Sequence, residues 1–121
     1  MEHLTAQEEE IMLVIWKQGK VFVKEIIAYL RTDIPYTTIA STVKNLEKKG
    51  YVQSEKMGNA FRYFPAIPQD DYKKTFMKEV VEDYFQNSYK QLVNFFVREK
   101  KLTAAELQEI IKMIEQNKDP L

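Results

Sequence analysis

The chain has 121 residues, enough for one domain or a small domain with an appendage, but not for two enzyme-sized folds. Its composition, 45% hydrophobic and 30% charged with few glycines and prolines, is typical of an ordered, soluble protein and excludes a low-complexity chain. Cysteine is absent, and the single histidine, His3, stands near the N-terminus. Disulfides, thiol chemistry and a transition-metal site are therefore not expected, and we predict no metal and no cofactor.

Neither a membrane span nor a secretory leader is indicated. No stretch approaches the ~18 consecutive apolar residues that cross a membrane. The first ten residues, MEHLTAQEEE, are acidic where a signal peptide begins with basic residues. We expect a cytoplasmic protein with no direct membrane binding. Because 18 basic residues balance 18 acidic residues, a surface that binds a polyanion has to arise from local clustering.

The first thirty residues predict two helices. Thr5 stands before the acidic run at 8–10, as at a helix start, because a hydroxyl accepts an amide hydrogen bond there and carboxylates favour that end of the helix dipole. This helix ends at Gly19, which can take a left-handed conformation. After an extended link at 20–22, the segment 23–30 has apolar residues at helical spacing. We interpret the acidic run as a solvated first turn.

A third helix is predicted over 37–49, between the break at Pro35 and the stop at Gly50. Thr37 or Thr38 is its expected cap. Apolar residues at every third or fourth position give this helix one buried stripe. The side chains on its opposite face are short, polar or cationic, and together they can both donate and accept hydrogen bonds. This face consists of Thr37, Ser41, Lys44, Asn45 and Lys48.

The segments 51–56 and 60–65 are rich in aromatic residues and predict a β-hairpin. They are joined by a three-residue link, 57–59, whose glycine and asparagine tolerate positive φ. Side chains alternate between the two faces of a strand. Phe61, Tyr63 and Pro65 of the second strand therefore share one face, and Arg62 is expected to point to solvent from the other.

From residue 69 on, the sequence consists of helical runs with many large apolar side chains. About fifty residues hide too little surface to bury all of them within one copy. A second copy can bury them, so we expect a two-fold homodimer. The chain divides into a winged-helix domain at 1–67 and a helical dimerisation domain at 68–121. The residues expected at the dimer contact are Tyr72, Phe76, Val80, Tyr84, Leu92, Phe95, Phe96, Leu107, Ile110, Ile111 and Ile114.

The order helix, helix, helix, hairpin is that of a winged helix-turn-helix. The expected fold class is mainly α with a small β-hairpin wing and a C-terminal helical dimerisation arm. Residues 1–35 contain four basic and six acidic residues, whereas 36–65 contain five basic and two acidic residues. This clustering predicts binding to double-stranded DNA through the third helix and the wing. The residues expected to contact DNA are Tyr36, Thr37, Thr38, Ser41, Thr42, Lys44, Asn45, Lys48, Lys56, Asn59 and Arg62.

The same residues allow other interpretations. Hydroxyls cap helices, Lys48 can stabilise a helix C-terminus, and charged residues on a hairpin keep its edges from pairing. The alternative function is a protein–protein interaction module without DNA binding, which the balanced overall charge favours. An enzyme is not indicated, because no nucleophile with a positioned base, phosphate-binding glycine loop or carboxylate pair is recognisable.

Four segments are informative together: LTAQEEEIMLVIWKQG at 4–19, YTTI at 36–39, LEKKGYV at 46–52 and GNAFRYFP at 58–65. They resemble the penicillinase repressor family of winged-helix regulators, which includes β-lactamase and methicillin-resistance repressors and a copper-responsive branch. The resemblance implies a dimeric transcriptional repressor that binds a palindromic, inverted-repeat operator, often with a TACA/TGTA core. It also implies release from the operator by an upstream signal.

The chain departs from the family pattern at positions that bear on the operator. Arginine is frequent in the family where this chain has Lys44, Asn45 and Asn59. An amide reads adenine, whereas arginine favours guanine, so a different operator sequence or affinity is expected. The copper branch carries C-terminal cysteines, which this chain lacks, so direct copper sensing is not expected.

The resemblance also implies one route of release. In the antibiotic-responsive branch the repressor is inactivated by proteolysis at an Asn-Phe bond in the dimerisation region, in response to a membrane sensor protease. Asn94-Phe95 matches that dipeptide, while the alignment places the family's bond nearer to Phe95-Phe96. Both bonds are kept as cleavage hypotheses.

Overall fold

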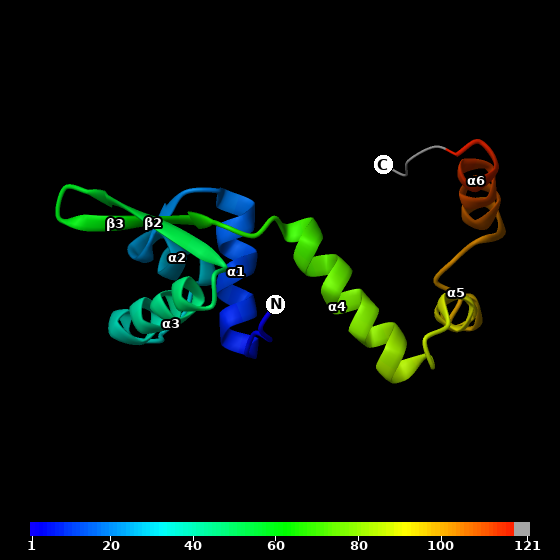
Figure 1. The fold of residues 1–121 in the computed structure, drawn as a ribbon, viewed down its shortest axis with the longest axis horizontal. Helices are drawn as coiled ribbons and strands as arrows, with labels where there is room; N and C mark the ends of the chain where they lie inside the picture. Colours follow the sequence, from blue (N-terminus) through cyan, green and yellow to red (C-terminus); the bar gives the residue numbers. More distant parts are fainter. Residues whose placement is uncertain (118–121) are drawn as a thin grey trace. The chain divides into compact units, whose positions relative to one another are not determined.

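The computed structural model describes residues 1–117 and contains two compact units, Met1–Thr75 and Phe76–Leu121 (Figure 1). The end of the expected dimerisation domain, residues 118–121, lies outside the described residues. Helix α4, Gln69–Tyr84, runs through the boundary, so its first turns belong to the first unit. The predicted fold class is confirmed: the chain is mainly helical, with a winged helix-turn-helix followed by further helices.

The first unit contains three helices and a three-stranded antiparallel sheet in the order β1-β3-β2. The hairpin was predicted, but the third strand was not. Two residues of the segment expected to be a link pair with β3, Val21 with Tyr63 and Phe22 with Arg62. A two-residue strand is too short to show an alternating pattern in the sequence. The elements are α1 Ala6–Gln18, β1 Val21–Phe22, α2 Val23–Leu30, α3 Tyr36–Lys48, β2 Val52–Met57 and β3 Ala60–Pro65.

The core of the first unit forms where the three helices pack against the sheet. Tyr63 of β3 is buried in it, whereas Phe61, two residues earlier on the same strand, is 46% exposed. Figure 1 shows the reason, since the hairpin projects past the helices. The buried core side chains are Ile11, Met12, Ile15, Val21, Val23, Ile26, Ile39, Val43, Leu46, Tyr51, Val52 and Tyr63.

The turn of the wing is shorter than predicted. Strand β2 continues through Met57, which pairs with Ala60, so the turn consists of Gly58 and Asn59. Gly58 has a backbone φ of +63°, a conformation that residues with a Cβ atom rarely adopt. The two-residue turn fixes the pairing of the whole hairpin and sets Glu55 opposite Arg62.

Helix α1 begins with the expected cap, but its acidic run is not fully solvated. The Thr5 hydroxyl accepts a hydrogen bond from the Glu8 amide, and the Glu8 carboxylate accepts one from the Thr5 amide. Glu8 is only 4% exposed. Its Oε1 lies 2.7 Å from Nζ of Lys49, which also donates to the His3 carbonyl. This ion pair joins the start of α1 to the end of α3, and the spacing of 41 residues hid it from sequence reasoning.

The Glu8–Lys49 pair predicts a pH-dependent contribution to stability. Burial raises the pKa of Glu8, but the hydrogen bonds from Lys49 and Thr5 outweigh burial, and the pKa lies below its ordinary value of 4.5. The stabilisation is therefore complete above pH 4.5 and is lost as the pH falls through the lowered pKa. We expect Lys49→Met to lower the free energy of unfolding at pH 7 by about 1–3 kcal/mol, because a buried carboxylate loses its cationic partner and keeps only the hydrogen bond from the Thr5 amide.

Urea unfolding at pH 7 and at pH values below 4.5 checks this, with the exposed neighbour Lys48→Met as the control. The control should change stability by less than about 0.5 kcal/mol at each pH. The loss in free energy of unfolding caused by Lys49→Met should be smaller in acid, because the carboxyl group of Glu8 is then neutral in the wild-type protein and in the variant. A cost that does not depend on pH contradicts the assignment.

The first turn of α4 packs on the winged-helix unit, which corrects the prediction for Tyr72. Its ring lies 5.2 Å from that of Trp16 and 6.0 Å from that of Tyr51, measured between centroids. The Tyr72 hydroxyl donates to the Glu9 carboxylate at 2.5 Å. Because Tyr72 is occupied within its own subunit, we remove it from the expected dimer contact.

The second unit contains the rest of α4, α5 Tyr89–Arg98 and α6 Ala104–Glu115. The sequence Thr103-Ala-Ala-Glu106 predicts a capping box at the start of α6, and the structure confirms it. Val81 of α4 is buried, and Phe95 has ring contacts with Phe85 and Phe96. None of the residues of α5 and α6 is buried. Large apolar side chains are exposed all along the unit: Phe76, Met77, Tyr84, Tyr89, Val93, Phe95, Phe96, Val97, Ile110, Ile111 and Ile114.

Candidate nucleic-acid interface

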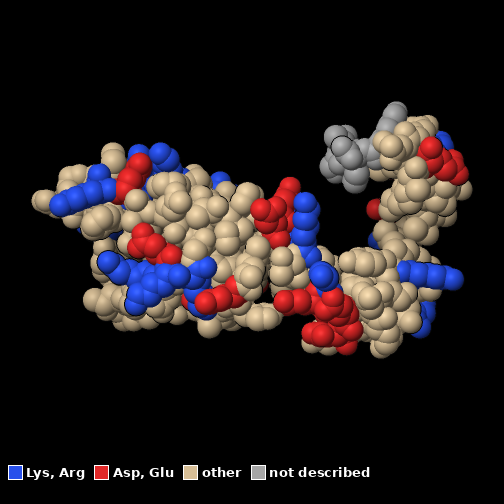
Figure 2. Space-filling model, viewed as in Figure 1, with Lys and Arg blue, Asp and Glu red and all other residues tan. Residues whose placement is uncertain are grey.

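The polar face of α3 is exposed over the full length of the helix. Its five residues, Thr37, Ser41, Lys44, Asn45 and Lys48, all lie at the surface, while the opposite stripe of α3 is buried in the core. On the face drawn in Figure 2, Lys and Arg side chains gather over α3, and more lie at the end of the wing. The face therefore combines hydroxyls, an amide and ammonium groups on one rigid element, without an apolar side chain among them.

The start of α3 differs from the prediction. The cap is Pro35, whose carbonyl accepts hydrogen bonds from the amides of Thr38 and Ile39, and no side chain caps the helix. Neither Thr37 nor Thr38 is a cap, because proline fixes the entry of the chain one residue before Tyr36. Both threonines are exposed. Their exposure leaves them available to an external ligand.

Thr42 is the one predicted contact residue that is buried. It is 7% exposed, and its hydroxyl lies 2.8 Å from the Thr38 carbonyl and 3.2 Å from the Gln7 side-chain oxygen. The hydroxyl thus links α3 to α1 instead of facing outward. We remove Thr42 from the expected DNA contacts, since its place one position past Ser41 turns it toward α1.

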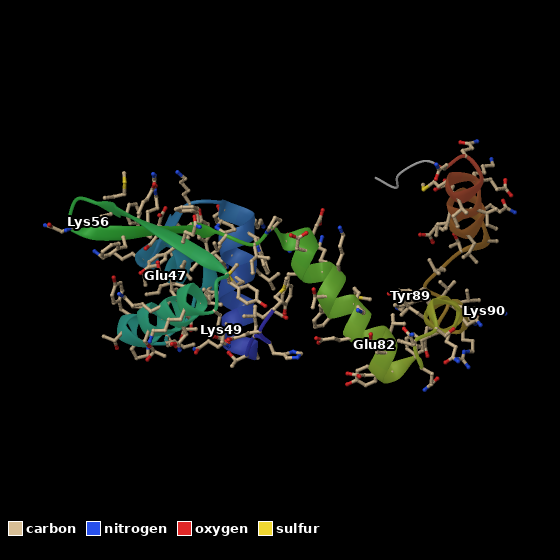
Figure 3. The ribbon with its side chains drawn as sticks, viewed as in Figure 1. Glu47, Lys49, Lys56, Glu82, Tyr89 and Lys90 are labelled. Atoms are coloured by element: carbon tan, nitrogen blue, oxygen red, sulfur yellow. The ribbon has the colours of Figure 1, made fainter. Side chains whose placement is uncertain are left out.

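Two hollows border the polar face of α3. On one side, Asn45 and Lys48 line a cavity of about 520 Å³ together with Thr5 and Gln7 at the start of α1. On the other side, Lys44 lines a cavity of about 380 Å³ that reaches to the wing. Figure 3 shows Lys49 between α3 and α1, where it holds Glu8. The start of α1 and the wing thus flank α3 on its two sides.

The wing carries exposed polar and apolar residues at its tip. Lys56 and Asn59 are exposed, and Figure 3 shows Lys56 standing out from the end of the hairpin. Tyr36 at the start of α3 is 51% exposed and Phe61 of β3 is 46% exposed. The sequence identified Tyr36 but not Phe61, because alternation places Phe61 and Tyr63 on one face of β3 without showing that only Tyr63 enters the core.

The sequence predicts that Arg62 points to solvent, but in the structure Arg62 is paired with a residue of the neighbouring strand. Its Nε lies 2.8 Å from Oε1 of Glu55, and its Nη2 also donates to that oxygen. Lys20 reaches the same carboxylate oxygen at 3.4 Å. The hydrogen bond from Arg62 is the main cause that holds the pKa of Glu55 below its ordinary value. Glu55 thus offsets part of the positive charge of Arg62 and Lys20.

Comparison with known proteins identifies the family. A model of the penicillinase repressor family matches residues 4–116. The chain belongs to the penicillinase repressor family. A penicillinase repressor of Bacillus licheniformis is 27% identical over 114 residues, which is 93% of this chain and 89% of that protein. The methicillin resistance regulatory protein MecI of Staphylococcus aureus is 24% identical over 109 residues, or 88% of this chain and 89% of that protein.

A solved structure agrees with the fold of this penicillinase repressor family member. The solution structure of the DNA-binding domain of the repressor BlaI matches with a TM-score of 0.52 and 33% identity, over 58% of this chain and 88% of that domain. The protein is accordingly a DNA-binding transcriptional repressor and not an enzyme. Within residues 1–117, no helix is both long and apolar enough to pass through a membrane.

The pairing of Arg62 makes a prediction for this repressor. Glu55→Gln removes one negative charge from the wing and frees Arg62 and Lys20 for phosphate contacts. We expect tighter binding to any duplex at low salt. The slope of the logarithm of the binding constant against the logarithm of the salt concentration should become steeper by about 1 per subunit. Fluorescence anisotropy with a duplex of arbitrary sequence, over a series of salt concentrations, measures both quantities.

Glu10→Gln provides the matched control, because it makes the same change of charge at an exposed position of α1. It should leave the salt dependence unchanged within error. If both substitutions steepen the salt dependence equally, the effect comes from the overall charge and not from release of Arg62.

Proposed function

We propose that this repressor acts as a two-fold homodimer on a palindromic, inverted-repeat operator, with α3 of each subunit in the major groove and each wing on the flanking backbone. The exposed polar face of α3 carries the proposal. Its amide suits the edge of adenine, and its hydroxyls and ammonium groups suit phosphates and base acceptors. The proposed contact residues are Tyr36, Thr37, Thr38, Ser41, Lys44, Asn45, Lys48, Lys56, Asn59 and Arg62.

The need for a dimer follows from the charge of one subunit. Residues 36–65 carry a small excess of basic residues, five against two acidic ones, so one subunit neutralises few phosphates and should bind weakly. Two subunits on two half-sites combine their contacts and read an inverted repeat. Such a role places the protein in the cytoplasm with the chromosome.

The exposed apolar side chains of the second unit support its assignment to dimerisation. Phe76, Phe96 and Ile114 are 45%, 39% and 72% exposed in the single subunit. Burial of apolar surface contributes about 25 cal/mol per Å², so sharing a few such side chains between subunits supplies several kcal/mol. We therefore assign DNA binding to the winged helix and dimerisation to the helical region that follows, with Tyr72 as a residue of the former.

Release of the operator is proposed to follow an upstream signal, with proteolysis in α5 as the route that the family membership suggests. Asn94, Phe95 and Phe96 lie within α5 and are exposed. A cut there separates α6 from α4 and removes part of the apolar surface proposed for the dimer. Incubation with a cognate membrane sensor protease should yield a fragment ending at residue 94 or 95. An intact chain under inducing conditions contradicts this route.

Salt-dependent binding tests the proposed function. The affinity of the repressor should be measured on a duplex with an inverted TACA/TGTA repeat and on a scrambled duplex of the same composition. We expect preference for the repeat, binding of two subunits per duplex, and an affinity that falls as salt rises. Equal affinity for both duplexes, or affinity that does not respond to salt, contradicts the proposal.

A further inference from the structure

The wing and α3 are in contact near the tip of the hairpin through a lysine and an aromatic ring. Nζ of Lys44 on α3 lies 5.9 Å from the centroid of the Phe61 ring on β3. This distance is within the range in which an ammonium group is attracted to the face of a ring. The contact connects the helix proposed to read bases with the strand proposed to follow the backbone.

Strand geometry explains why Phe61 points toward α3. Phe61 and Tyr63 are two residues apart on β3, so they share one face of the sheet. Tyr63 is 4% exposed and enters the core, while Phe61 is 46% exposed because the hairpin has passed the edge of the helices. The ring of Phe61 is therefore directed to the helix side of the wing without being packed into the core.

Helix geometry explains why the partner is Lys44. Tyr36, Ala40 and Lys44 are four residues apart and form a stripe along the wing side of α3. All three line the cavity of about 380 Å³ that also reaches Phe61 and Tyr63. Apolar packing thus does not close the space between wing and helix at this level, and the Lys44–Phe61 contact crosses it.

We propose that Phe61 is a positioning residue, which holds the Lys44 ammonium group and aligns the wing with α3 so that both meet the operator as one unit. The inference rests on the proposed function and deepens it. The mobile side chain of a lysine loses rotamer freedom when its ammonium group binds a fixed acceptor. Lys44 is already restrained by Phe61, so less freedom is lost on a correctly shaped site.

The role of Phe61 predicts a loss of discrimination rather than a loss of all binding. Without the ring, Lys44 remains cationic and still attracts any duplex, but it is no longer held in place. An exposed contact of an ammonium group with a ring corresponds to about two- to fivefold in affinity per subunit. Phe61→Leu should therefore weaken binding to the inverted TACA/TGTA repeat by that factor per subunit and leave binding to the scrambled duplex nearly unchanged.

A double-mutant cycle tests the proposal with Phe61→Leu, Lys44→Gln and the double variant. If Phe61 acts through Lys44, Phe61→Leu has no further effect once Lys44 is replaced. Phe61→Tyr keeps the ring and should restore wild-type discrimination. The matched control combines Phe61→Leu with Lys48→Gln, because Lys48 lies on the same helix as Lys44 but lines the other cavity. In this control the effects of the two substitutions on the binding free energy should add.

NMR gives a readout that does not depend on DNA. In the wild-type protein the ε-methylene protons of Lys44 should be shifted upfield by the Phe61 ring, and the shift should vanish in Phe61→Leu and persist in Phe61→Tyr. Additive effects in the Phe61–Lys44 cycle, or no ring-dependent shift, overturn the role of Phe61. A wild-type protein that does not distinguish the two duplexes contradicts the proposed function instead.

Discussion

The substitution Ile114→Glu is expected to convert the repressor into a folded monomer. Ile114 is 72% exposed in the single subunit, so a glutamate there changes the stability of the isolated chain by less than about 0.5 kcal/mol. In the proposed dimer the carboxylates of two subunits would instead be buried or crowded at the contact. An unpaired buried charge costs several kcal/mol, so we expect the dimer dissociation constant to rise at least about a hundredfold.

Loss of the dimer should also weaken operator binding. The second half-site is then bound by an independent subunit and no longer at a high effective concentration, which costs about 10²-fold or more in affinity. Analytical ultracentrifugation at micromolar concentration measures the first effect. Anisotropy with the inverted-repeat duplex measures the second.

Ala105→Glu is the matched control, because it adds the same charge on the same helix. Ala105 is exposed and lies about half a helical turn from Ile114 around the axis of α6, away from the apolar stripe of Ile110 and Ile111. The control should remain dimeric. A wild-type protein that sediments as a monomer, or two variants that dissociate alike, would contradict the assignment of this face to the dimer.

The second large effect is expected for Asn45→Ala on α3. Asn45 is exposed on the polar face and is the amide best suited to an adenine edge. Loss of a bidentate base contact costs about 1–3 kcal/mol per subunit, and the dimer has two such contacts. We therefore expect the affinity for the inverted-repeat duplex to fall about 30-fold or more. The affinity for the scrambled duplex should change little, and the salt dependence of binding should not change.

Lys48→Ala serves as the contrasting variant, because it removes a charge from the same face. It should weaken binding to both duplexes alike and reduce the salt dependence by about 1 per subunit. The two variants together separate base reading from phosphate binding. If Asn45→Ala weakens both duplexes equally, Asn45 is not a base-reading residue, and a different residue of the α3 face discriminates.

The wing shows how a small error in local structure changes a functional prediction. With the predicted three-residue link at 57–59, Lys56 would have paired with Ala60 and Arg62 would not have faced Glu55. In the structure the turn is Gly58 and Asn59, which sets Glu55 opposite Arg62. A correct turn length would have predicted this pair, since register follows from the loop. The contact of Lys20 with the same carboxylate needed β1, which the sequence did not predict.

Sequence alone determined the order of helices and hairpin, the helix ends at Thr5, Gly19 and Thr103, and the exposed polar face of α3. These features depend on periodicity and capping, which act between residues a few positions apart. It also predicted the membership in the penicillinase repressor family, through motifs that are short and continuous.

Only the tertiary structure decided the features that join distant segments. The burial of Glu8 against Lys49, the turn of Thr42 toward Gln7, and the packing of Tyr72 on Trp16 each connect residues more than thirty positions apart. A helical period shows which side of a helix is polar but not which neighbour that side meets. That choice is made by the packing of α3 and of the first turn of α4 against α1 in the folded first unit, where close fit and the pairing of buried polar groups select the partners.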